Sequence, residues 1–311
     1  MSPASVPALS ILVPTRNRAD VLPRLLRTLD AAQAEAQVDL EVVVVDNGST
    51  DGTAAVLDRW AAAAPGRVRM FVEQPGRARA LNRALPVARA PLLAFTDDDV
   101  EVTPHWIRSL VAFFAVHPEY DAAMGRVRVP PAAADPATLA RVAQFPGTLP
   151  LFDAGDAVRD VPYMWGCNMA VRRRVIDTVG PYDERLGVGA SGLYEDAEFS
   201  ERIRRAGLRI GYMPDAVVYH SVDPTRLTRQ WFREFNVRLA RSRYLIDPPQ
   251  PWRRNLLRFL DAALSCAWWR LLGQRQRSLK AWARMIQHRE MLRLRWNDRS
   301  IPRRVGHEEA G

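Results

Sequence analysis

The chain has 311 residues, of which 48% are hydrophobic and 25% charged, as is typical of a globular protein with one large α/β domain or two smaller ones. Its two cysteines, Cys167 and Cys266, are too few for a disulfide framework and lack the spacing of a metal site, so we expect a reducing compartment. The amino terminus lacks the basic start and apolar core of a signal peptide, and we therefore predict a cytoplasmic protein.

The net charge of +9 is concentrated in one segment. Residues 252–311 hold 14 Arg and Lys against 5 Asp and Glu, whereas residues 1–251 hold 30 of each kind. The basic balance therefore belongs to a C-terminal tail and does not identify a partner of the main domain.

The first hundred residues predict four strands that alternate with helices. Apolar and β-branched runs predict strands over 9–13, 40–45, 68–72 and directly after Pro91, with helices in the intervals. We expect the first strand to stop at Pro14, because proline cannot donate to a sheet ladder, and Asp20 to cap the first helix. Strands separated by helices of this length indicate parallel βαβ units.

Polar residues follow three of these strands: Thr15 the first, Asp46 the second and Asp97–Asp99 the fourth. Right-handed crossovers would bring these positions to one edge of the sheet, where open α/β sheets bind ligands. A single acidic loop is usually a surface turn, but three polar loops on one edge predict a pocket. The chain contains neither a Gly-x-Gly-x-x-Gly fingerprint nor a P-loop, so a bound diphosphate would need a divalent cation to offset its repulsion from the carboxylates.

The second part of the chain is less regular. Thr103 is expected to cap a helix that runs to about Val116, and a strand is expected over 122–129. Residues 130–162 predict a long irregular connection with a role in substrate gating, and regular structure resumes over 164–171.

A second acidic pair, Glu195 and Asp196, opens a predicted helix that ends at Gly207. Acidic residues are favoured in the first turn of any helix, so the pair also fits a purely structural role. The same helix dipole would keep Asp196 ionised, as a proton acceptor must be. His220 ends a short predicted strand over 216–220 and is either structural or a metal ligand.

Several segments together resemble the family 2 glycosyltransferases of the GT-A fold, over roughly residues 8–245. The matching segments are 11–18, 45–51, 95–99 and 195–202, with 76–82 and 166–173 in support. The resemblance implies an α/β fold whose mixed, mostly parallel sheet is flanked by helices. It also implies a GT-A domain over 1–245, with a nucleotide-binding half at about 8–100 and an acceptor half at about 101–245, followed by a basic, Trp-rich helical tail over 246–311.

The resemblance implies inverting transfer of a sugar from a nucleoside-diphosphate sugar to a hydroxyl acceptor. Thr15, Asp46 and Asp97 would hold the donor, and Asp196 would be the catalytic base. Leu81 stands where the family commonly has Arg, so Arg79 is kept as a further candidate donor contact.

The remaining residues that the resemblance assigns are a metal pair and an acceptor side. Asp99 and His220 would bind Mg or Mn, and Trp165, Gly166 and Glu195 are expected on the acceptor side. These residue types suit the chemistry, because a base deprotonates the acceptor on one side of the sugar ring while a cation neutralises the departing diphosphate on the other.

The acceptor is expected to be a sugar or a lipid-linked sugar, in cell-surface glycan or glycolipid synthesis. The Gln-x-x-Arg-Trp motif of processive synthases is absent, since Glu234 follows Arg233, and this favours the addition of one sugar at a time. A sugar-phosphate nucleotidyltransferase of related fold is the alternative enzyme, although the loop after the first strand lacks the glycines that such an enzyme needs.

The tail interleaves Arg with Trp over residues 252–304. Its uncharged stretch, 262–269, is too short to cross a bilayer, and the pattern suits a helix lying on an anionic membrane surface, which would make the protein peripheral on the inner face of the membrane. A helical extension packed on the main domain explains the pattern equally well, and nucleic-acid binding is disfavoured. A non-enzymatic membrane adaptor would explain the tail but leave the carboxylates without a purpose.

Overall fold

The computed structural model describes residues 6–247 and 251–297. Two predictions concern segments outside the described residues: the absence of a signal peptide concerns residues 1–5, and the end of the basic tail is residues 298–311. The described residues form two compact units, of which the first comprises 6–135, 149–184 and 195–222, and the second 136–148, 185–194, 223–247 and 251–297.

The first unit is built on an eight-stranded sheet with the order β3-β2-β1-β4-β7-β6-β8-β5. Its strands are β1 (Leu9–Thr15), β2 (Leu40–Asp46), β3 (Arg67–Phe71), β4 (Leu92–Thr96), β5 (Val100–Val102), β6 (Ala122–Arg128), β7 (Asn168–Arg172) and β8 (Ile210–His220). Six strands point the same way, and β7 and β5 run antiparallel to their neighbours. The predicted mixed, mostly parallel sheet is therefore confirmed.

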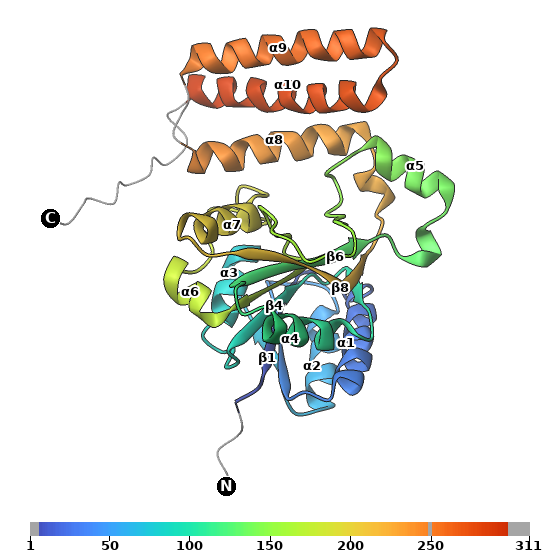
Figure 1. The fold of residues 1–311 in the computed structure, drawn as a ribbon, viewed down its shortest axis with the longest axis vertical. Coiled ribbons are helices and arrows are strands. Elements are labelled where there is room, and N and C mark those ends of the chain that lie inside the picture. Colours follow the sequence, from blue (N-terminus) through green and yellow to red (C-terminus); the bar gives the residue numbers. More distant parts are fainter. Residues whose placement is uncertain (1–5, 248–250, 298–311) are drawn as a thin grey trace, which may run out of the picture. The chain divides into compact units, whose positions relative to one another are not determined.

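Helices cover both faces of this sheet. They are α1 (Leu22–Ala36), α2 (Thr53–Ala62), α3 (Arg77–Ala84), α4 (Trp106–Val116), α6 (Arg173–Val179) and α7 (Glu195–Arg205). Helices α1, α2 and α4 lie on one face, and α3, α6 and α7 on the other (Figure 1). Every residue of β1, β2 and β4 is buried as a result, which explains why these strands read as continuous apolar runs in the sequence.

Strand β1 does not stop at Pro14, as the sequence suggested, but continues to Thr15. The carbonyl of Thr15 accepts a hydrogen bond from the Asn47 amide at 2.8 Å, so Thr15 faces β2. Because successive residues of a strand bond to opposite neighbours, Pro14 faces β4, and the pairing of β4 with β1 already ends at Leu12. The missing N–H of Pro14 therefore costs no ladder bond.

The two predicted helix caps in this unit are wrong. Helix α1 has no side-chain cap from Asp20, because the Arg18 carbonyl accepts from the amides of Val21 and Leu22 instead. Helix α4 begins three residues after Thr103, whose hydroxyl donates to the Val217 carbonyl at 3.0 Å. In both places a backbone partner satisfies the groups that a cap would have used.

The predicted irregular connection over 130–162 contains a short 3₁₀ turn (Pro131–Ala133) and the helix α5 (Pro136–Gln144). Helix α5 belongs to the second unit and buries none of its own residues, although Leu139, Val142 and Ala143 follow helical spacing in its sequence. On the first unit, Phe152 pairs with Val127 in an isolated antiparallel bridge.

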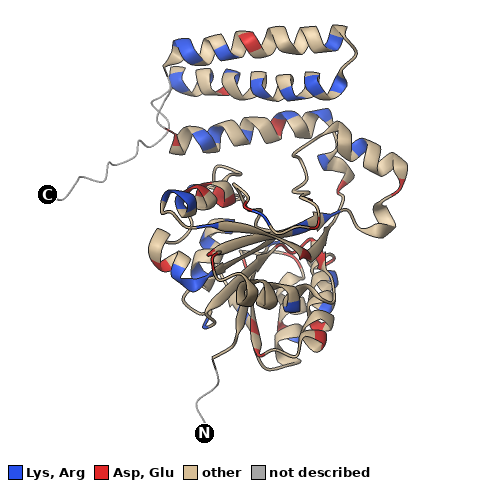
Figure 2. Ribbon diagram, in the orientation of Figure 1, with Lys and Arg blue, Asp and Glu red and all other residues tan. Residues whose placement is uncertain are grey.

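The second unit is helical. Besides α5 it contains a 3₁₀ turn (Pro224–Arg226) and the long helices α8 (Arg229–Ile246), α9 (Trp252–Leu271) and α10 (Arg275–Trp296). Helix α10 packs against both α8 and α9, and Arg and Lys recur along all three (Figures 1 and 2). Thr228 caps α8 by accepting from the Trp231 amide at 3.1 Å. Among the described helices, none offers a stretch long and apolar enough to span a bilayer.

Candidate active site

The loops after β1 and β2 meet because the two strands pair in register. Thr15 lies opposite Asp46, and both are buried. One carboxylate oxygen of Asp46 accepts from the Ser49 amide at 2.9 Å, whereas Oδ2 is buried and has no hydrogen-bond partner among the described residues. A buried carboxylate oxygen without a donor is costly in the free protein, so it marks a place where a ligand hydroxyl or N–H group could bind.

Side-chain hydrogen bonds fix the shape of these two loops. Asn17 has a positive φ of 53° and accepts from the Thr50 amide through its side chain at 2.8 Å. Asn47 accepts from the Gly76 amide at 2.9 Å and so ties the end of β2 to the start of α3. The carboxyl edge of the sheet is thus a preformed surface.

Arg77, the first residue of α3, lies between two groups of carboxylates. Its Nη2 donates to Asp97 Oδ1 at 2.7 Å, and its Nη1 donates to Glu195 Oε1 at 3.1 Å and to Asp196 Oδ1 at 3.0 Å. The second oxygen of Asp196 accepts from the Gly166 amide at 2.8 Å. Asp97 at the end of β4 and Asp196 at the start of α7 are therefore joined through one guanidinium.

The charges in this group shift several pKa values. Burial lowers the pKa of Arg77, but the charges of Asp196, Asp97 and Glu195 raise it well above its usual value, so Arg77 remains charged. Burial, followed by the charge of Asp196, raises the pKa of Glu195 to about 7. Glu195 therefore exchanges its proton near neutral pH.

Gly166 permits the close approach of Arg77 and Asp196. A Cβ atom at this position would lie 2.1 Å from Arg77 Nη2 and 2.8 Å from each carboxylate oxygen of Asp196. Only glycine fits at this position, because the side chains of Arg77 and Asp196 occupy the place that a Cβ atom would take.

Asp99 and His220 are brought together by the antiparallel pairing of β5 with β8, in which Val100 lies opposite His220. The His220 Nε2 lies 3.4 Å from Asp99 Oδ1, and Nδ1 is 2.8 Å from the Ser221 carbonyl, to which it donates because a carbonyl can only accept. This is the arrangement of histidines that bind metals, whose second ring nitrogen is held by a carbonyl or carboxylate.

Asp98 is buried beside Arg18, whose Nε lies 3.4 Å from Asp98 Oδ1 and whose Nη2 lies 3.9 Å from Asp99 Oδ2. Burial, followed by the charge of Asp99, raises the pKa of Asp98 to about 7. The three consecutive carboxylates therefore do not all carry a full charge at neutral pH.

Arg79 and Trp165 were also predicted at the site. Arg79 donates to Glu184 at 3.0 Å and to Gln74 at 3.2 Å, rather than to the carboxylates around Arg77. Trp165 precedes Gly166 and is 39% exposed, so its ring offers an open aromatic surface.

Two residues of the site were not predicted, namely Arg77 and Arg18. Both stand inside segments that the resemblance singled out, 76–82 and 11–18, but each was passed over for a neighbour. Both arginines are positively charged, and a cluster of carboxylates needs positive charge nearby. That requirement could have identified them as residues of the site. Within the described residues, no group of three or more His, Cys, Asp or Glu side chains is arranged to hold a metal ion, and Asp99 with His220 is a pair.

The sequence of this chain is similar to those of known glycosyltransferases and glycan biosynthesis proteins. The protein-family model of glycosyl transferase family 2 matches residues 10–180. Validoxylamine A glucosyltransferase of Streptomyces hygroscopicus subsp. jinggangensis is 44% identical over 115 residues, which is 35% of this chain and 26% of that protein. The succinoglycan biosynthesis protein ExoM of Rhizobium meliloti is 27% identical over 223 residues, 71% of this chain and 69% of that one.

Among solved structures, the mannosyltransferase PcManGT of Pyrobaculum calidifontis superposes with a TM-score of 0.54 at 22% identity, covering 96% of this chain and 78% of that one. That structure holds GDP-Man and Mn2+. The likeness confirms the predicted GT-A fold. The chain spans about a quarter of the length of the glucosyltransferase that it matches.

Proposed function

This chain belongs to glycosyl transferase family 2, and on that premise we propose that it transfers a sugar from a nucleoside-diphosphate sugar to a hydroxyl acceptor with inversion. The observation that carries the proposal is the joining of Asp97 and Asp196 through Arg77, because it brings a donor-side and an acceptor-side carboxylate to one site. The two acidic segments are about a hundred residues apart in the chain, and a surface role would not require them to meet.

The donor nucleotide binds in this proposal at the ends of β1 and β2. Thr15 and Asp46 are buried there in register, and the unpartnered Oδ2 of Asp46 is an acceptor for a base N–H or a ribose hydroxyl. Asp97 would contact the donor from the end of β4. The GDP-Man in the PcManGT structure supports a nucleotide sugar as the donor class.

Asp99 and His220 fit a divalent cation such as Mg or Mn. Their facing oxygen and nitrogen atoms lie 3.4 Å apart, and the opposite nitrogen of His220 is held by a carbonyl, so Nε2 can offer a lone pair. When bound, the cation would neutralise the charge that develops on the departing diphosphate. The Mn2+ in PcManGT supports this assignment.

Asp196 would accept the proton of the acceptor hydroxyl. Each of its oxygens already accepts one hydrogen bond, from Arg77 and from Gly166, and each retains a second lone pair. The bonds hold the carboxylate in one orientation, as a positioned base requires. Trp165, exposed beside Gly166, would offer its ring to a sugar acceptor, with Glu195 on the same side.

A sugar or lipid-linked sugar acceptor in glycan or glycolipid synthesis fits the similarity to a succinoglycan biosynthesis protein. We also propose that α9 and α10 lie on an anionic membrane surface. The support is their charge, with eleven Arg and Lys against two Asp and Glu over residues 252–297, together with the large apolar side chains that α9 exposes.

The test is the product. Purified protein and MnCl₂ are incubated in one set of reactions with a panel of nucleoside-diphosphate sugars, and in a second set with nucleoside triphosphates and sugar 1-phosphates. We expect release of nucleoside diphosphate in the first set; release of pyrophosphate in the second set would instead identify a nucleotidyltransferase.

The same assay tests the role of Asp196 as the catalytic base. Asp196→Asn is expected to slow transfer by about 10²–10⁴-fold, because a general base contributes that much, while calorimetry still detects donor binding. Asp99→Ala is expected to weaken donor binding in the presence of Mn2+. Asp177→Asn, an exposed carboxylate of α6, is the matched control and should leave both unchanged. Normal turnover by Asp196→Asn would refute the assignment.

A further inference from the structure

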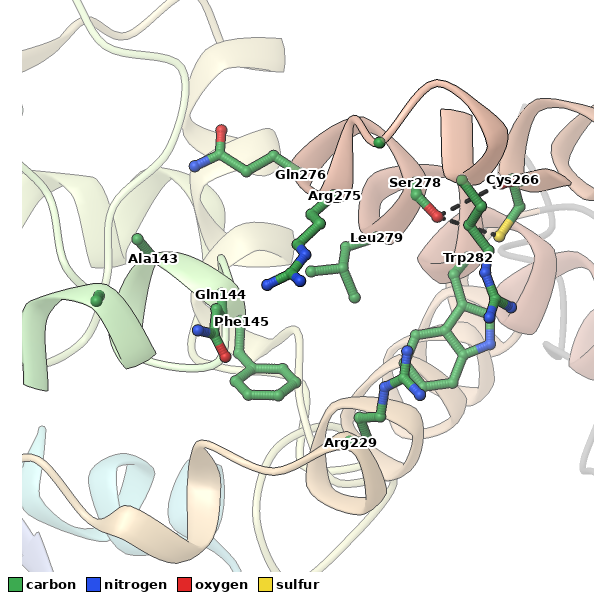
Figure 3. Close-up of a pocket in the computed structure, with 13 residues that line it drawn as sticks. Ala143, Gln144, Phe145, Arg229, Cys266, Arg275, Gln276, Ser278, Leu279 and Trp282 are labelled. Carbon is green, nitrogen blue, oxygen red and sulfur yellow. Dashed lines mark hydrogen bonds between the residues drawn. The ribbon is translucent and has the colours of Figure 1, made fainter. Parts of the chain in front are cut away.

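The helical unit contains a cavity of about 1010 Å³ that the proposed reaction does not use. Its walls come from the end of α5, the start of α8, the end of α9 and the first turns of α10 (Figure 3). All of these elements belong to the second compact unit, so the cavity is a property of that unit alone.

The lining of the cavity carries positive charge. Arg229, Arg270 and Arg275 line it, whereas no Asp or Glu does. None of the three arginines forms an ion pair with a carboxylate in the described part of the chain. Helix α10 also begins at this wall without a side-chain cap, and an uncapped helix N-terminus favours an anion.

The lining also includes apolar side chains. Phe145, directly after α5, lines the cavity together with Leu279 and Trp282 of α10, and Figure 3 shows these side chains interspersed with Arg229 and Arg275. Trp282 is held in place by stacking on Phe232, with ring centroids 5.3 Å apart. The Arg229 guanidinium lies 5.8 Å from the Trp282 ring centroid, so a charged and an apolar side chain of the lining are neighbours.

We infer that this cavity binds a lipid phosphate, that is, one apolar chain that ends in a phosphate or diphosphate group. Inorganic phosphate would leave the apolar side chains of the lining uncovered, and a neutral lipid would not accept the charge-assisted hydrogen bonds that the three arginines can donate. The size of the cavity, about 1010 Å³, suits a chain together with its head group. The inference goes beyond the proposed transfer reaction and does not depend on it.

The experiment is calorimetric titration of the full-length protein with decyl phosphate below its micelle concentration, without nucleotide sugar. Decanol supplies the same chain without the charge, and inorganic phosphate supplies the charge without the chain. We expect saturable one-to-one binding of decyl phosphate that is at least about tenfold tighter than that of either fragment, since a charge-assisted hydrogen bond is worth about 1.5–3 kcal/mol.

Two variants test the location. Arg229→Gln with Arg275→Gln is expected to weaken binding at least about tenfold, and Ala143→Trp, on the exposed wall of α5, is expected to weaken it by occupying part of the cavity. Arg289→Gln on α10 is exposed and does not line the cavity, so it should bind like the wild type.

Unchanged binding in both the arginine and the Ala143→Trp variants would overturn the inference, as would equal affinity for decanol or for inorganic phosphate. Circular dichroism melts verify that each variant is folded. Because no transfer is measured, failure of the proposed reaction would leave this result intact, and the converse also holds.

Discussion

Arg77 explains how the chain tolerates its acidic cluster. Asp97, Glu195 and Asp196 all lie within hydrogen-bond distance of this one side chain, which is only 12% exposed. Buried carboxylates at such distances repel one another strongly unless a cation lies among them. The site is therefore held together by a charge whose removal affects three acids at once.

We predict that Arg77→Met lowers the free energy of unfolding by about 3–5 kcal/mol at pH 8, because it leaves the buried Glu195 and the half-buried Asp97 and Asp196 without their partner. The loss should shrink at pH 5, where Glu195, whose pKa is raised to about 7, holds a proton. Urea unfolding followed by circular dichroism measures both values. The matched control is Arg79→Met, two residues along α3, where a more exposed pair with Glu184 is worth about 0–1 kcal/mol. Equal losses at the two positions would contradict this account.

Glu195 gives a prediction about pH. Its pKa in the folded protein is about 7, above the ordinary value of 4.5. Between these two pH values the folded state therefore holds a proton that the unfolded state has released. The contribution to stability is therefore complete below pH 4.5 and is lost as the pH rises to about 7. Glu195→Gln should remove this loss, on the order of 2–3 kcal/mol.

The measurement compares the free energy of unfolding at pH 4.5 and pH 7.5 in the wild type and in Glu195→Gln. Asp98, whose pKa is also raised to about 7, titrates in both proteins, so the variant should keep part of the dependence. If the difference between the two pH values is the same in both proteins, Glu195 does not hold its proton as described.

At the scale of elements, the first strands and their parallel pairing were predictable, whereas the packing that brings the site residues together was not. Runs of apolar residues determine β1, β2 and β4, and helices of regular length between them imply parallel pairing, which fixes where the strands end. The contact of Arg77 with Asp196 joins residues 119 positions apart and depends on how α3 and α7 pack, which no local pattern encodes. The pairing of β5 with β8, which brings His220 to Asp99, is not encoded by a local pattern either, and only the family resemblance joined these two residues.

The loop that precedes β7 gives the prediction at this scale. Gly166→Ala should reduce transfer at least tenfold, about the cost of displacing a catalytic group, because the new Cβ would overlap Arg77 and crowd Asp196. Transfer rates and donor affinity are both measured, and donor affinity should change less than the rate. Gly52→Ala is the control, since a Cβ there meets only Ala19 at 3.5 Å. Equal transfer rates in the two variants would show that the reaction does not depend on the position in which Gly166 allows Asp196 to lie.

At the scale of the whole molecule, the sequence located the basic charge in the tail but not its arrangement. The described part of that tail forms the helices α9 and α10, as predicted, and Arg and Lys recur along both (Figure 2). Which residues of α9 turn away from α10 depends on the pairing of the two helices. Leu257, Leu264 and Leu271 are 67%, 73% and 83% exposed, and their spacing of seven places them along one face of α9.

An exposed face of this kind leads to a prediction about membranes. The protein should float with vesicles that contain phosphatidylglycerol and detach as salt is raised, because the arginines contribute a screened attraction. Leu257→Gln with Leu264→Gln should reduce the bound fraction at least tenfold, since burial of each leucine in lipid is worth about 1.5–3 kcal/mol. Both side chains are exposed in the protein, so their replacement should not change its stability. Val116→Gln, which alters a comparably exposed residue at the end of α4, should float like the wild type. Undiminished flotation of the double variant would show that α9 does not face the lipid.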